Sequence, residues 1–162
     1  MLFPLTLSFP HCYLYIQMTI SNELLHNCLY FTANTLARNI NRLAEEAFGP
    51  TGLSSSHALL LMLINEQPGI SQKELAEAMH LAPSTMTRFV NVLMQRGLAV
   101  KESRGKLAIV HPTSQGQEMQ PVIMESWKRL YHRYSAILGE LEGVELTRVI
   151  DLANTDIEEK IS

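Results

Sequence analysis

The segment 71–113 constrains the fold more than any other part of the chain, because start and stop signals for two short helices lie within it. Ser71 and Glu74 form an S-x-x-E capping-box pattern, which predicts the first turn of a helix. Pro83 is placed where a second helix would begin, since the first helical position does not need the missing N–H. Gly97 predicts the end of that second helix.

The second predicted helix, residues 83–95, has two distinct faces. Its apolar residues recur at helical spacing and predict a buried face: Met86, Phe89, Val90 and Leu93. Its polar residues form a second stripe without an acid: Ser84, Thr87, Arg88, Asn91 and Gln95. Hydroxyl, amide and guanidinium groups of this kind contact base edges and phosphates in a DNA major groove. The stripe therefore predicts a DNA-contacting surface rather than an ordinary solvated helix face.

A small β-hairpin is predicted after the two helices. Residues 98–102 and 107–111 have strand composition, and the turn between them contains Gly105 and the cations Arg104 and Lys106. Two helices joined by a tight turn and followed by a basic hairpin indicate a winged helix-turn-helix.

The run APSTMTRFVNVLMQRGLAV, residues 82–100, resembles the recognition helix of the MarR family of bacterial transcription regulators. The run HPTSQGQEM, residues 111–119, resembles that family's step from the wing into the next helix, and a looser similarity covers residues 22–161. The resemblance implies a dimeric DNA-binding regulator, in many relatives responsive to a small aromatic or phenolic effector. The family's wing usually carries D-x-R, whereas residues 102–106 hold no Asp. We therefore expect Arg104 or Lys106 to replace the wing arginine, with no evident residue to hold them.

The net charge of −3 does not argue against nucleic acid, because the charge is unevenly distributed. Residues 71–106 contain six cations and three acids, and residues 140–162 contain two cations and seven acids. The positive charge thus lies in the predicted winged unit.

The predicted fold class is mainly α with a small β-hairpin wing, in which a winged helix-turn-helix is joined to a helical dimerisation region. We assign residues 53–112 to the DNA-binding domain, and residues 18–52 and 113–162 to the dimerisation region. Apolar stripes on the outer helices are too wide for one winged domain to cover. They therefore predict a homodimer, whose two-fold symmetry matches a palindromic operator in double-stranded DNA.

The outer helices are predicted from their apolar periodicity. A long helix should run from Ser21 to about Ala47, and a helix of about 26 residues should follow Thr113. A hinge at residues 139–143 should lead into the last helix. Residues 1–17 contain no charged side chain, and three interpretations remain open: a signal or anchor, an upstream artefact with Met18 as the physiological start, or an extension that packs on a partner.

The candidate site residues fall into two sets. The predicted DNA-contacting set comprises Ser71, Gln72, Lys73, Pro83, Ser84, Thr85, Thr87, Arg88, Asn91, Arg104 and Lys106. The resemblance further implies an effector pocket between the dimer helices and the winged unit, for which Asn34, Arg38 and His57 are the polar candidates.

Other classes of function receive less support from the sequence. Cys28 in the first helix suggests a redox-sensing regulator, but its position on the apolar stripe favours packing in a core. A winged-helix module for protein contacts is a further alternative. The histidines and cysteines lack metal-ligand spacing, so no metal or other cofactor is expected, and no nucleotide-binding or hydrolase motif indicates an enzyme. We expect a cytoplasmic protein without a membrane span.

Overall fold

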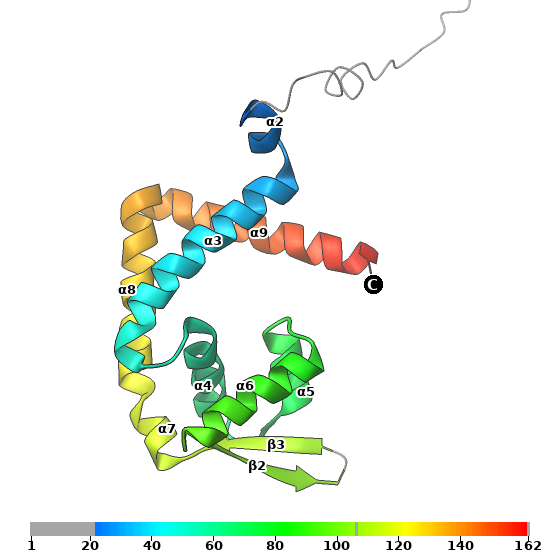
Figure 1. The fold of residues 1–162 in the computed structure, drawn as a ribbon, viewed down its shortest axis with the longest axis vertical. Helices are drawn as coiled ribbons and strands as arrows, with labels where there is room; N and C mark the ends of the chain where they lie inside the picture. The colour runs from blue at the N-terminus through cyan, green and yellow to red at the C-terminus, as the bar shows by residue number, and fades with distance from the viewer. Residues whose placement is uncertain (1–21, 106, 162) are drawn as a thin grey trace, which may run out of the picture. The chain divides into compact units, whose positions relative to one another are not determined.

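The computed structural model describes residues 22–105 and 107–161, so the predictions for residues 1–17 and for Lys106 lie outside the described residues. The chain divides into two compact units, Met1–Ile40 and Asn41–Ser162. Figure 1 labels the helices and strands in chain order.

The described part of the first unit contains α2 (Asn22–His26) and the beginning of α3 (Leu29–Phe48). The single long helix expected here is therefore interrupted at Asn27 and Cys28. Asparagine competes with the helical backbone for hydrogen bonds, which favours a break at this point. The carbonyl of Cys28 accepts hydrogen bonds from the backbone N–H and the hydroxyl of Thr32, at 2.9 and 3.0 Å, and so starts α3. The expected burial of Cys28 is wrong, since its side chain is exposed.

The second unit has one hydrophobic core around α4 (Ser55–Glu66). Helix α4 is apolar nearly all round and is buried on more than one side, and its N-cap Ser54 accepts the backbone N–H of His57. The Glu45 carboxylate adds a second cap, because it accepts hydrogen bonds from the backbone N–H and the hydroxyl of Ser55. The largest fully buried apolar side chains of the core are Phe48, Leu60, Leu61, Ile64, Leu75, Met86, Val90, Leu93, Val110 and Ile123.

The winged unit is built on a three-stranded antiparallel sheet in the order β1-β3-β2. The expected hairpin is confirmed as β2 (Ala99–Arg104) and β3 (Leu107–Pro112), paired from Ala99↔Pro112 to Arg104↔Leu107. The short strand β1 (Ile70–Ser71) was not expected, and it pairs with β3 on the other side. Two helices complete the unit, α5 (Gln72–Ala78) and α6 (Pro83–Gln95), and Figure 1 shows them together with α4 beside the hairpin.

The segment after the wing forms three helices, α7 (Ser114–Glu118), α8 (Gln120–Leu138) and α9 (Glu140–Ile161). Thr113 is the N-cap of α7, as expected. The expected continuous helix is nevertheless broken at Met119, because Pro121 has no N–H to bond the carbonyl four residues before it. The expected five-residue hinge is Gly139 alone, which has φ 95° and ends α8.

Most of the apolar stripe predicted for α8 and α9 is not buried within the described chain. Ile123 of α8 is fully buried, whereas the large apolar side chains that remain exposed on these helices are Val122, Met124, Trp127, Ile137, Leu138, Leu141, Val144, Val149, Ile150, Leu152, Ile157 and Ile161.

Among the described residues, no single helix has both the length and the apolar character that a membrane crossing requires. The bent pair Leu29–Thr51 and Ser55–Glu66 meets the test of length and composition only when its two helices are combined.

Candidate nucleic-acid interface

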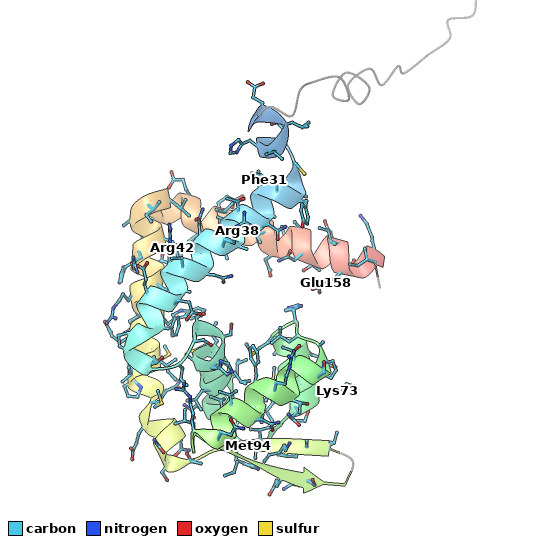
Figure 2. The ribbon with its side chains drawn as sticks, in the orientation of Figure 1. Phe31, Arg38, Arg42, Lys73, Met94 and Glu158 are labelled. Carbon is cyan, nitrogen blue, oxygen red and sulfur yellow. The ribbon has the colours of Figure 1, made fainter. Side chains whose placement is uncertain are left out.

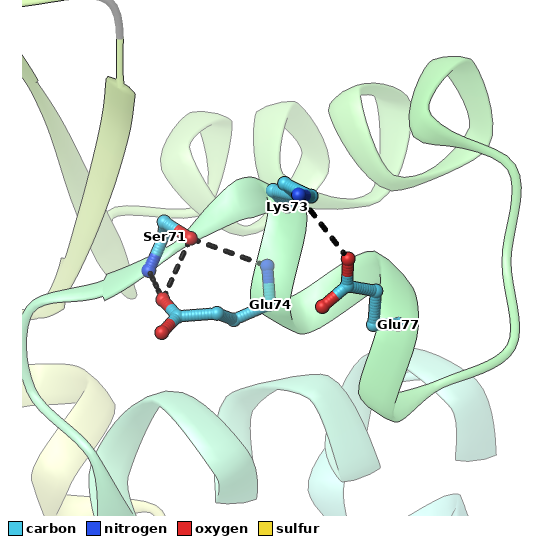
Figure 3. Close-up of polar contacts among 4 residues, drawn as sticks. All are labelled: Ser71, Lys73, Glu74 and Glu77. Atoms are coloured by element: carbon cyan, nitrogen blue, oxygen red, sulfur yellow. Dashed lines mark hydrogen bonds and ion pairs between the residues drawn. The ribbon is translucent and has the colours of Figure 1, made fainter.

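The first helix of the helix-turn-helix is fixed by the predicted capping box (Figure 3). The Glu74 carboxylate accepts hydrogen bonds from the hydroxyl and the backbone N–H of Ser71, at 2.6 and 2.9 Å, and the Ser71 hydroxyl accepts the backbone N–H of Glu74 at 3.2 Å. These hydrogen bonds hold the pKa of Glu74 below its ordinary value. Ser71 itself is only 5% exposed, so its side chain caps α5 and does not lie on the surface.

The other two predicted contacts at this end of α5 differ in exposure. Lys73 is exposed and makes an i,i+4 ion pair with Glu77, with 3.7 Å between the ammonium nitrogen and the carboxylate oxygen (Figures 2 and 3). Gln72 is partly buried, and its side-chain nitrogen is enclosed without a hydrogen-bond partner among the described residues. Of the three residues predicted here, Lys73 is therefore the one that presents a charged group to solvent.

The turn between α5 and α6 depends on a left-handed residue. His80 has φ 50°, a conformation that histidine adopts more readily than most residues with a side chain. The turn is closed by a hydrogen bond from the backbone N–H of Leu81 to the carbonyl of Ala76, at 2.9 Å. This geometry fixes the direction in which α6 leaves α5.

Helix α6 has the predicted bounds and the predicted two faces. Pro83 is at its first position, and Met86, Val90 and Leu93 are fully buried on its inner face. Phe89, also expected in the core, is partly buried against it. On the opposite side, the exposed residues are Pro83, Ser84, Thr87, Arg88, Asn91 and Gln95, and Thr85 is half-buried beside them.

Two of the polar side chains on α6 are held by local hydrogen bonds. The Thr87 hydroxyl donates to the carbonyl of Pro83 at 3.0 Å, and an Arg88 guanidinium nitrogen donates to the Thr85 hydroxyl at 3.3 Å. Four of the five guanidinium N–H groups of Arg88 are left for other acceptors. An arginine in this arrangement can form two parallel hydrogen bonds to a guanine edge or to a phosphate.

The wing arginine has an ion-pair partner that the sequence prediction did not include. A carboxylate oxygen of Glu102 lies 3.6 Å from a guanidinium nitrogen of Arg104 and 3.4 Å from the His111 Nε2. The expectation that nothing holds the wing cations is therefore wrong for Arg104. The signal was present in the sequence, because Glu102-Ser103-Arg104 keeps the spacing of the family's acid and arginine with Glu in place of Asp.

The three effector candidates belong to different units. Asn34 and Arg38 are exposed on the part of α3 that lies in the first unit, where they donate to the Tyr30 carbonyl at 2.7 Å and to the Thr35 hydroxyl at 2.9 Å (Figure 2 shows Arg38). His57 lies on α4 in the second unit. That unit has a hollow of about 330 Å³, and none of the three candidates lines it. The hollow is lined by Thr51, Leu53, Arg96, Leu98, Gln115 and Met119.

In the described part of the chain, no group of three His, Cys, Asp or Glu side chains is placed to hold a metal ion.

The fold and the surface together define a winged helix-turn-helix protein, with α6 as the helix that presents polar groups and β2–β3 as the wing. Residues 53–103 match the sequence model of the MarR family. This match confirms the resemblance drawn from residues 82–100, and residues 53–103 of the chain are similar to the winged helix-turn-helix of that family.

A relative and two solved structures are similar to this chain. The HTH-type transcriptional regulator YybA of Bacillus subtilis strain 168 is 29% identical over 91 residues, which cover 54% of this chain and 61% of YybA. A MarR-family regulator from Listeria monocytogenes, complexed with a 26mer DNA, has a TM-score of 0.69 at 21% identity, over 83% of this chain and 91% of that one. CouR from Rhodococcus jostii RHA1, bound to p-coumaroyl-CoA, has a TM-score of 0.66 at 21% identity, over 81% of this chain and 92% of the CouR chain. At these identities the solved structures establish the fold.

Proposed function

We propose that this protein is a sequence-specific DNA-binding transcription regulator of the MarR type, which acts as a cytoplasmic repressor. The observation that carries the proposal is the division of α6 into a fully buried face and an exposed stripe of Ser84, Thr87, Arg88 and Asn91. The stripe is without acids, and its hydroxyl, amide and guanidinium groups are those that contact base edges. A surface for protein contacts would not need this set of groups. Residues 53–112 would be the DNA-binding domain.

The proposal is tested with DNA that flanks the protein's own gene. Purified protein is mixed with labelled fragments in the presence of excess unrelated competitor DNA, and the bound region is located by footprinting. We expect protection of a palindromic segment that survives competition. If unrelated competitor DNA displaces every labelled fragment equally, whatever its sequence, then binding is not sequence-specific and the proposal is contradicted.

The wing is proposed to contribute charge rather than sequence preference. Arg104→Ala is expected to weaken binding to the footprinted duplex and to a scrambled duplex by similar factors, because a cation near the backbone binds phosphates. The log–log dependence of affinity on salt should become shallower by about 0.9 for each phosphate that the variant no longer neutralises. Fluorescence anisotropy at several salt concentrations measures both quantities.

A matched control for the wing variant is Lys128→Ala, since Lys128 is exposed on α8 outside the winged unit. This variant should keep both affinities and the salt dependence. If Arg104→Ala removes only the preference for the footprinted duplex, the wing recognises sequence and the proposed division between helix and wing is wrong.

The protein is further proposed to act as a homodimer. Large apolar side chains are exposed on the helices that flank the winged unit, among them Leu29, Trp127 and Val149, and exposed apolar surface of this extent indicates an association site. Residues 18–52 and 113–162 would form the dimerisation region, and a two-fold dimer would place two α6 helices on a palindrome.

Leu146→Glu combined with Val149→Glu is expected to abolish the dimer, because two carboxylates on α9 would be buried in an apolar interface. Neither residue belongs to the core around α4, so the winged unit should stay folded. Sedimentation equilibrium and circular dichroism measure the two effects. A double variant that remains dimeric and binds DNA normally would contradict the assignment of α9 to the interface.

A small aromatic or phenolic effector is proposed to release the protein from DNA. CouR, which has a similar fold, was solved with p-coumaroyl-CoA bound. The test is release of the footprinted duplex by a panel of aromatic acids and their coenzyme A thioesters. Failure of the whole panel would contradict this part of the proposal and leave DNA binding unaffected.

A further inference from the structure

A histidine of α4 is in direct contact with the helix that presents the polar stripe. The imidazole ring of His57 is stacked on the phenyl ring of Phe89 in α6, with 4.5 Å between the ring centroids and 28° between the planes. The Nδ1 atom of His57 lies 2.6 Å from the hydroxyl oxygen of Ser54, the N-cap residue of α4. The ring is therefore fixed on one edge by α4 and on one face by α6.

The other edge of the same ring has no partner. The His57 Nε2 is buried and makes no hydrogen bond with any of the described residues. A charged imidazole carries an N–H on both nitrogens, whichever nitrogen holds the proton in the neutral ring. Protonation of His57 would thus place a positive charge on a half-buried ring and an N–H donor on a buried atom that has no partner among the described residues.

The charged groups around His57 act in opposite directions. Burial lowers the pKa of His57 below its ordinary value of 6.5, the nearby Arg96 at the end of α6 lowers it further, and Glu45 of α3 raises it. The Glu45 carboxylate is already held by two hydrogen bonds from Ser55, so it is committed to capping α4. The neutral ring is the form that this environment favours.

Phe89 is the side chain through which this histidine acts on α6. It lies next to Arg88 in the chain and one helical turn from Thr85, which accepts a hydrogen bond from Arg88. Met86, Val90 and Leu93 also hold α6 in the core. Loss of the ring stack would therefore loosen one contact between α6 and α4, on the side next to the exposed stripe.

We propose that neutral His57 is a positioning residue for the DNA-contacting helix α6, and that gain of a proton by His57 releases Phe89 and weakens DNA binding. The inference rests on the proposed DNA-binding function. The stabilisation from neutral His57 is complete above pH 6.5 and is lost as the pH falls through the lower pKa of the folded chain. Affinity for DNA should fall in the same direction.

The direction of the pH effect separates this mechanism from ordinary electrostatics. Exposed histidines that gain a proton make the protein more positive and strengthen its attraction to DNA. A positioning role of His57 gives the opposite sign. Weaker binding at lower pH is therefore a readout that general charging of the surface would not produce.

The experiment measures binding to the footprinted duplex by fluorescence anisotropy at about pH 8 and about pH 5.5, on either side of the ordinary histidine pKa. Wild-type affinity should fall by up to about tenfold per subunit at the lower pH, since each subunit must then release the proton of His57 in order to bind. His57→Phe keeps an aromatic ring against Phe89 and cannot take the proton, so its affinity should not fall. His57→Gln, also uncharged at both pH values, is the second variant if the first does not fold.

The matched control is His132→Phe, because His132 is exposed on α8 beside Tyr131. This variant should show the wild-type fall in affinity. Wild-type binding that is unchanged or tighter at the lower pH overturns the inference, as does an equal fall in the His57 variants. Failure to bind any duplex at either pH overturns the proposed function and this inference together.

Discussion

Replacing Gly116 with alanine is expected to lower the free energy of unfolding by about 3 kcal/mol, at the upper end of the usual cost of overpacking. A Cβ atom at this buried position would lie only 2.1 Å from the carbonyl oxygen of Leu98. That oxygen belongs to the backbone and accepts the N–H of Thr113 at 3.1 Å, so it cannot move aside as a flexible side chain would. Urea unfolding followed by circular dichroism measures the change.

Gly49→Ala is the matched control for this prediction. Gly49 also lacks a positive φ, and a Cβ there would have no atom within 4 Å. Its substitution should change the free energy of unfolding by no more than about 0.5 kcal/mol. Equal losses in the two variants would show that the close approach of α7 to the Leu98 carbonyl is not the cause.

The largest expected effect on DNA binding comes from Arg88→Ala. The guanidinium of Arg88 is exposed on the polar stripe and has a single hydrogen bond within the described chain, to Thr85. Removing its pair of hydrogen bonds to a base should reduce the free-energy preference for the correct base over a wrong one by about 1–3 kcal/mol in each half-site. Titration of the footprinted and scrambled duplexes should show a large loss of affinity for the first and a small loss for the second.

The control for Arg88→Ala is again Lys128→Ala, which removes a cation of the same charge from α8. It should leave both affinities unchanged. If Arg88→Ala instead weakens both duplexes by the same factor and makes the salt dependence shallower, Arg88 binds phosphate and sequence preference comes from other residues of the stripe.

The sequence predicted the winged unit well because its signals are local. The capping box of Ser71 and Glu74 and the first-position proline Pro83 act within a few residues, and the two-faced pattern of α6 reflects burial on one side only. Such signals are independent of where distant parts of the chain lie. The bounds of α6 and its buried face followed from them directly.

Features that depend on pairing or on single interruptions were not predicted. β1 has two residues and exists because Ile70 and Ser71 pair with Val110 and Ile109, which no local pattern shows. The breaks at Asn27 and before Pro121 interrupt stripes that are otherwise periodic. Apolar periodicity alone predicts a longer helix than the backbone can form across such residues.

In the candidate site, too, local features were predictable from the sequence and features that depend on distant contacts were not. The exposure of Ser84, Thr87, Arg88 and Asn91 was predictable from helical phase. The burial of Ser71 was not, since its position in the strand β1 and in the capping box both enclose it. The contact of His57 with Phe89 joins residues 32 positions apart in the sequence, so only the packing of α4 on α6 shows it.

The proposal that α6 recognises a DNA sequence is tested most directly by one titration of the wild-type protein. Its dissociation constants are measured for the footprinted duplex and for a scrambled duplex of equal length and composition, at several salt concentrations. We expect a preference for the footprinted duplex of about 10³ or more, with both affinities falling as salt rises. Equal dissociation constants for the two duplexes at every salt concentration would contradict it.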